Sequence, residues 1–173
     1  MKPLNYYGSS IIATPLHYCE TYDEAIQYLE QGWRGDEICA GISPYLHCCN
    51  DIQILEECLK RGAKTSNDFL QTSALHSHSK LSFIRMLVSY GADVNYVNWN
   101  GSTPLHKANN LGVIKFLISK GANPNILNND GLLPGDDYPS GIKWEKMKNY
   151  LLQARQNTVD TQQNTACNAM YPK

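Results

Sequence analysis

The stretch that decides the fold is "GSTPLHKANNLGVIKFLISKGANPN", which runs from Gly101 to Asn125. A threonine and a proline open it, an apolar pattern follows His106, and Gly121 ends that pattern. Threonine is a favoured helix N-cap, proline suits the first helical position, and glycine readily takes the positive φ that often follows a helix. The stretch therefore predicts a capped helical unit, in which His106 could be catalytic, metal-binding or structural.

The same arrangement recurs along the chain. Leu-His dipeptides place histidines at successive spacings of 30, 29 and 30 residues, and each histidine is followed 15 residues later by a glycine. The histidines are His17, His47, His76 and His106, and the glycines are Gly32, Gly62, Gly91 and Gly121. One offset that occurs four times indicates an internal repeat, and the apolar residues between histidine and glycine follow one face of a helix.

Each unit has the pattern of two short antiparallel helices followed by a polar loop. The clearest loop is "GADVNYVNWNGSTP" at residues 91–104, which is rich in the asparagine and glycine that favour tight turns. The sequence therefore predicts an all-α solenoid of helix–turn–helix units joined by hairpin-like loops. The repeats fall at about residues 10–39, 40–68, 69–98 and 99–128.

This pattern resembles the ankyrin repeat, most closely in the third and fourth units. The matching residues are "GADVN" at 91–95 and Gly101, Thr103, Pro104, Leu105, His106, Ala108, Leu117, Gly121, Ala122 and Asn125. The family's repeat is usually about 33 residues long, and here every unit is shorter, with the missing residues between its two helices. Each unit should therefore bury less apolar surface against its neighbours and be less stable than is usual in the family.

A fifth, incomplete unit at residues 129–155 is expected to cap the array. It places Asp136 at the position of His106, and Trp144, Met147 and Leu151 share one helical face, with lysines mostly on the other. We expect residues 1–155 to form the repeat domain. Residues 156–173 are polar, and we expect them to be a mobile tail.

The recurrence of the histidines favours a structural role, in which each ring bonds the backbone of the next repeat. Equivalent side chains should lie roughly 10 Å apart, whereas zinc needs ligands at about 2 Å from one point. A metalloprotein or enzyme that uses His76, His78 and cysteines is the alternative hypothesis. The sequence has no nucleophile elbow, phosphate-binding loop or HExxH motif. We therefore expect no enzymatic activity, no cofactor and no small-molecule substrate.

Composition narrows the classes of partner. The sequence has no apolar run long enough for membrane insertion and no signal-peptide pattern. We therefore expect an intracellular protein with reduced cysteines. It would be located in the cytoplasm or nucleus, or be delivered into a host cell by a pathogen. Residues 1–62 carry a net charge of −5 and residues 63–155 a net charge of +4. An elongated molecule would thus have an acidic and a basic end. Nucleic acid remains a third hypothesis for the basic half, but the near-zero total charge does not favour it.

The resemblance implies that a partner protein binds the concave face formed by the loop tips and first helices. Phe69 and Trp99 occupy equivalent tip positions in adjacent units. Because aromatic side chains dominate many interfaces, we expect this pair to bind the partner. The alternative is that both side chains pack against a neighbouring loop. The candidate partner-binding residues are Phe69, Leu70, Tyr96, Trp99, Asn100, Lys80, Lys107 and Asn110. The sequence predicts a protein–protein interaction module that acts as an adaptor, inhibitor or host-directed effector, with an unidentified partner.

Overall fold

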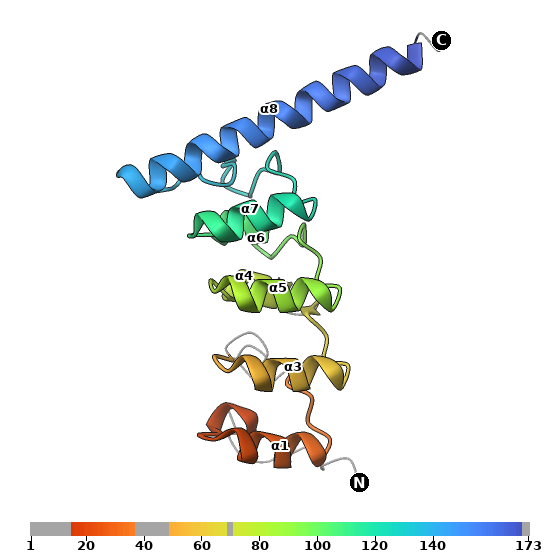
Figure 1. Ribbon diagram of the computed structural model, residues 1–173, viewed down its shortest axis with the longest axis vertical. Helices are drawn as coiled ribbons and strands as arrows, with labels where there is room; N and C mark the ends of the chain where they lie inside the picture. Colours follow the sequence, from red (N-terminus) through yellow and green to blue (C-terminus); the bar gives the residue numbers. More distant parts are fainter. Residues whose placement is uncertain (1–14, 37–48, 69–70, 171–173) are drawn as a thin grey trace.

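The helices stack in chain order into an elongated array, with the first described helix at one end and the C-terminal helix across the other (Figure 1). The computed structural model describes residues 15–36, 49–68 and 71–170, without the side chains of His17 and of residues 159–170. The prediction of an all-α solenoid is confirmed. The described elements are η1 (Pro15–Tyr18), α1 (Tyr22–Glu30), α3 (Ile52–Lys60), β1 (Ser66–Asn67), β2 (Thr72–Ser73), α4 (Ala74–Ser77), α5 (Leu81–Ser89), α6 (Pro104–Lys107), α7 (Leu111–Ser119) and α8 (Ile142–Met170).

Each described repeat pairs a very short first helix with a longer second one. Helices α4 and α6 have four residues each, whereas α5 and α7 have nine. The Ser73 hydroxyl accepts a hydrogen bond from the Leu75 N–H at the start of α4, and Pro104 follows the N-cap Thr103 at the start of α6. A four-residue helix is not stable alone, because helix nucleation costs more than one turn returns. The first helices therefore depend on packing in the stack.

Glycine ends the second helix of each described repeat. Gly91 and Gly121 have φ angles of 86° and 88°, in the left-handed region that glycine tolerates best. The next residue, Ala92 or Ala122, donates its N–H to the carbonyl of Leu87 or Leu117 at 3.0 Å. Gly32 and Gly62 have positive φ angles too. The repeated glycine therefore turns the chain out of each long helix and into the loop that leads to the next repeat.

The core runs continuously through the stack. Helix α5 buries Phe83, Ile84 and Leu87, and α7 buries the equivalent Val113, Ile114 and Leu117. Cys49 and Cys58 are fully buried in the same core, as small apolar side chains. Because each repeat covers the apolar face of the next, no described unit has a separate core.

The C-terminal cap is fastened to the array by polar contacts. The carboxylate of Asp136 accepts the Leu133 N–H at 2.9 Å, so it bonds the residue three before it, as His106 does in the preceding repeat. Arg155 of α8 donates to the carbonyls of Pro134 and Pro124, at 2.7 and 3.3 Å. Met147 and Leu151 of α8 are fully buried against the last repeat. These contacts close the end of the core.

Helix α8 continues to Met170 and passes through most of the segment expected to be a mobile tail. Residues 142–170 contain neither glycine nor proline, so nothing in the sequence breaks the helix after the cap. The backbone of residues 156–170 is therefore helical. The domain boundary at residue 155 and the mobility of the segment beyond it stay predictions.

Candidate partner-binding surface

The loop from Tyr96 to Gly101 carries Trp99, the most exposed aromatic side chain among the residues that the structure describes. Asn98 Oδ1 accepts the N–H groups of Asn100 and Ser102 at 3.0 and 2.9 Å, which closes the loop into a tight hairpin. Gly101 takes a φ of 71° at the turn. Loops 91–103 and 121–133 follow α5 and α7 at the same end of these helices, at the right in Figure 1. Their tips lie side by side, because the Asn129 N–H donates to the Asn100 carbonyl at 3.1 Å.

Trp99 combines a fixed backbone with a free side chain. Its N–H donates to the Gln71 carbonyl at 3.1 Å, and its carbonyl accepts a hydrogen bond from Asn129 Nδ2 at 3.2 Å. The side chain is nevertheless 70% exposed. Both neighbouring loops thus hold the main chain of Trp99 in place while its indole ring lies in solvent.

Two other predicted residues of this loop are occupied by contacts between repeats. The Tyr96 hydroxyl donates to the Asp68 carboxylate at 3.2 Å, and burial followed by this hydrogen bond raises the pKa of Tyr96. The Asn100 carbonyl accepts the Asn129 N–H at 3.1 Å. Phe69 and Leu70 lie outside the described residues, so the aromatic pair of Phe69 and Trp99 stays a prediction.

The polar candidates near the first helices lie in three different settings. Lys80 is exposed, with its ammonium group 5.4 Å from the centre of the Phe83 ring. Lys107 is exposed at the end of α6. Asn110 caps α7, because its Oδ1 accepts the Gly112 N–H at 2.7 Å. A role for these three residues in partner binding stays a prediction.

His106 forms hydrogen bonds with both ring nitrogens. Nδ1 accepts the Thr103 N–H at 3.0 Å, so the proton of the neutral ring lies on Nε2, which donates to the Leu132 carbonyl at 3.1 Å. Burial lowers the pKa of His106, partly offset by the hydrogen bond to Leu132. The ring therefore joins two successive repeats and has no lone pair left for a metal or a substrate proton.

His76 makes the equivalent contact one repeat earlier. Its Nε2 bonds the Ser102 carbonyl at 2.9 Å, and burial lowers its pKa. His78 stacks on the Phe83 ring, with the ring centres 5.0 Å apart. Within residues 15–36, 49–68 and 71–158, no group of three or more His, Cys, Asp or Glu side chains is arranged to hold a metal ion. The His17 side chain and the whole of His47 lie outside the described residues.

The periodic comparison of the sequence missed two features of this surface. Val97 and Leu127 are 30 residues apart, and both are about half exposed at equivalent loop positions. Asn95 bridges two loops, because its side chain donates to the Gly121 carbonyl at 3.0 Å and accepts the Asn123 N–H at 2.8 Å. The 30-residue spacing could have identified the apolar pair, but no local signal distinguishes the bridging asparagine from other loop asparagines.

Comparison with known proteins agrees with this geometry. A family model described as ankyrin repeats (3 copies) matches residues 45–128. A search of curated proteins found no match. None of the helices in the described part of the chain is both long and apolar enough to cross a membrane. This match agrees with the histidine-to-glycine units of the sequence and with the stacked helix pairs of the structure. Over residues 45–128 the chain belongs to the ankyrin-repeat family.

Proposed function

We propose that this chain is a protein–protein interaction module that binds its partner through the loop tips around Trp99. Ankyrin repeats generally serve to bind proteins, and the family is typically non-enzymatic. The observation that carries the proposal is the 70% exposed indole of Trp99 on a backbone bonded to both neighbouring loops. Tryptophan is enriched among the few residues that dominate interface energies.

The fixed backbone matters because binding must offset the entropy of ordering the surface. A loop already bonded to Gln71 and Asn129 loses little further freedom when a partner covers it. Val97 and Leu127 would add apolar contact area on the same loop and the next one. We expect these residues to form the apolar centre of the interface, with Lys80 and Lys107 at its rim to favour an acidic partner segment.

The module would act by occupying or bridging surfaces, as an adaptor, an inhibitor or a host-directed effector. Histidine is a common catalytic residue, but the rings of His76 and His106 each form a hydrogen bond with a backbone carbonyl of the next repeat. Cys19 is a free thiol, which favours a reducing compartment such as the cytoplasm or nucleus. We therefore propose an intracellular binding role without chemistry of its own.

Affinity capture with the full chain as bait, followed by mass spectrometry, would identify the partner. The same capture with Trp99→Ala tests the surface, and Phe69→Ala combined with Trp99→Ala tests the predicted aromatic pair. We expect Trp99→Ala to weaken binding by more than about tenfold, because removal of a central interface tryptophan commonly costs about 2 kcal/mol or more.

The matched control is Leu152→Ala, which removes a half-exposed apolar side chain on α8 instead of the loop tips. The control should retain the partner, and all variants should keep the thermal midpoint of the parent chain. Equal capture by the parent chain and by the Phe69 and Trp99 double variant would exclude the loop tips as the binding surface.

A further inference from the structure

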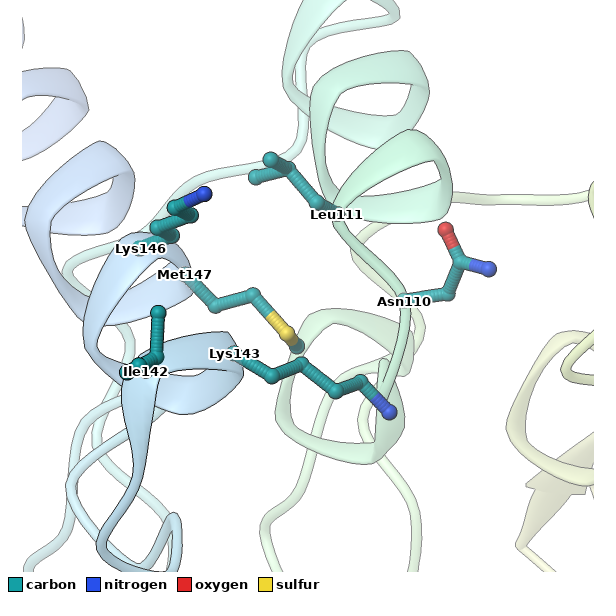
Figure 2. Close-up of a pocket in the computed structure, with 6 residues that line it drawn as sticks. All are labelled: Asn110, Leu111, Ile142, Lys143, Lys146 and Met147. Atoms are coloured by element: carbon teal, nitrogen blue, oxygen red, sulfur yellow. The ribbon is translucent and has the colours of Figure 1, made fainter.

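A groove lies between the start of α7 and the start of α8, formed by the turns where those helices begin. It encloses about 420 Å³ and is lined by Asn110, Leu111, Ile142, Lys143, Lys146 and Met147. Figure 2 shows Met147 and Lys143 extending from α8 toward the α7 side of the groove, with Ile142 and Lys146 on the same helix. The lining thus combines three apolar side chains with two ammonium groups.

The groove is suited to a segment that carries both an apolar side chain and carboxylates. Ile142 is 80% exposed at the edge of the groove, which leaves apolar surface for a ligand to cover. Across the residues whose side chains are described, neither Lys143 nor Lys146 forms an ion pair; Lys143 instead lies over the Trp144 ring, 4.6 Å from its centre. This lining fits a peptide, whose apolar side chain and carboxylates match the apolar groups and the two ammonium groups. It fits a nucleic acid less well, because a continuous phosphate backbone needs more cations.

The opposite end of the same chain presents that chemistry. Tyr18 and Tyr22 are 68% and 38% exposed. Three exposed acids lie beside them, Glu20 between η1 and α1, and Asp23 and Glu24 in the first turn of α1. None of these acids forms an ion pair within the described part of the chain. We name the segment Tyr18–Glu24 the acidic turn.

The acidic turn is held in one conformation before it meets a ligand. Thr21 caps α1 by accepting the Glu24 N–H at 3.3 Å, and the Glu24 carboxylate accepts the Glu20 N–H at 3.0 Å. These two hydrogen bonds hold the turn, so little conformational entropy is lost when a second surface binds it.

The two surfaces of one molecule cannot meet, because α1 and α8 lie at opposite ends of the stack (Figure 1). We propose that the groove between α7 and α8 binds the acidic turn of a second copy of this chain, which joins copies head to tail. Residues 1–62 carry a net charge of −5 and residues 63–155 a net charge of +4, so the acidic half of one copy would attract the basic half of another. This attraction favours the proposed head-to-tail contact. A contact of this kind uses two different surfaces, so it builds rings or open chains rather than a symmetric dimer.

Sedimentation velocity of the full chain over a range of concentrations tests the proposal. We expect the weight-average sedimentation coefficient to rise with concentration in about 50 mM salt and to rise much less in about 500 mM salt, where charges are screened within a few ångströms. A single, concentration-independent monomer at low salt would overturn the proposal.

Charge reversal on each side then locates the contact. The groove variant Lys143→Glu with Lys146→Glu, and the turn variant Glu20→Lys with Asp23→Lys, should each weaken self-association by at least about tenfold. The turn variant keeps Thr21 and Glu24, and the bond from residue 20 uses its backbone N–H, so both hydrogen bonds that hold the turn are preserved. Lys115→Glu with Lys120→Glu is the matched control, because it makes the same charge change on α7 and at its C-cap, outside the groove lining.

Mixing the two reversed variants is the decisive measurement, because the unchanged acidic turn of the groove variant then meets the unchanged groove of the turn variant, and the two reversed surfaces also carry opposite charges. We expect the mixture to associate although each variant alone does not. The proposal would be overturned if the mixture stayed monomeric, or if the control lost as much association as the groove variant. Unchanged circular dichroism and thermal midpoints show that all variants are folded, and retained capture of the loop-tip partner separates this contact from the proposed function.

Discussion

Two consecutive loops share one scaffold and differ at their tips. In both, an asparagine side chain, Asn98 or Asn128, accepts two backbone N–H groups at 2.9–3.0 Å. In both, a histidine of the preceding first helix bonds the residue after the loop glycine. The tip residue is Trp99 in one loop and Asn129 in the other, 30 residues later. Trp99 extends its ring into solvent, whereas Asn129 turns its amide back to the Trp99 carbonyl.

In these two loops, stability and the exposed binding group depend on different positions of the repeat. Residues that recur with the repeat period hold the loops, and the position that varies between repeats is free to present a binding group. Asn129 shows that a varying position can also serve the scaffold, because it bonds both Trp99 and Asn100 of the neighbouring loop. The tip of the last described loop thereby supports the tip before it.

The largest effect is expected from Gly101→Ala, which breaks the contact between the two loops. A Cβ at Gly101 would lie 2.7 Å from the Asn129 backbone nitrogen, whereas a Cβ at Gly131, the equivalent glycine, would meet nothing within 4 Å. Both residues have φ near 70°, so the left-handed strain is alike and costs about 1 to 2 kcal/mol. We expect urea unfolding to show Gly101→Ala losing about 3 to 4 kcal/mol, which is about 2 kcal/mol more than Gly131→Ala loses. Equal losses would mean that the close approach has no energetic weight.

The next largest effect concerns the histidines that anchor the loops. His106→Ala removes two hydrogen bonds and leaves the Thr103 N–H and the Leu132 carbonyl without them, which should cost about 3 kcal/mol in the free energy of unfolding. His76→Ala removes the bond to the Ser102 carbonyl and should cost about 1 to 2 kcal/mol. Thermal or urea unfolding of both variants checks the order. A larger loss for His76→Ala would contradict the hydrogen-bond assignment.

The same histidines predict how stability depends on pH. Burial lowers the pKa of both His76 and His106, so below the ordinary histidine value of about 6.5 the unfolded chain binds more protons than the folded chain. Stability should therefore be full above that pH and fall as the pH drops from about 6.5 toward the lowered values. We expect the thermal midpoint to decrease between pH 7.5 and about 5.5, and His106→Gln to decrease less. An equal decrease in parent and variant would show that His106 does not contribute.

The smallest effects are expected at the two tips themselves. Asn129→Ala loses one hydrogen bond to the Trp99 carbonyl and should cost about 1 kcal/mol, whereas Trp99→Ala should change stability by less than about 0.5 kcal/mol. Binding should respond in the reverse order, with Trp99→Ala the more damaging. Chemical unfolding and partner capture on both variants make the comparison, and a large stability loss in Trp99→Ala would assign the indole to the scaffold.

Much of the fold was predictable because the decisive features are local and periodic. The caps at Ser73 and Thr103, the helix-ending glycines and the buried stripe of α7 all follow from residue type and spacing. The placement of Asp136 at the histidine position also follows from the 30-residue spacing. The exposed Trp99 was a candidate for the same reason, since it departs from the repeat.

The candidate surfaces were less predictable because they depend on which distant side chains meet. No spacing rule indicates that Asn129 bonds Trp99, that Tyr138 bonds the Ala108 carbonyl, or that Arg155 returns to Pro124 and Pro134. The groove beside Ile142 depends in the same way on the position of α8 against α7.

The repeat and the class of fold follow from the sequence alone, because backbone geometry and helix capping depend on neighbours within a few residues. The recurrence of the histidines favoured a structural role for His106, and its bond to the Leu132 carbonyl required the packed repeats. Packing between repeats also sets which groups remain exposed. In the folded chain the indole of Trp99 lies in solvent, and the amide of Asn129 bonds the Trp99 carbonyl. Ile142 remains exposed in the groove that Lys143 and Lys146 also line. The exposure of a side chain depends on which residues of the neighbouring repeats cover it, and those residues lie some 30 positions away along the chain.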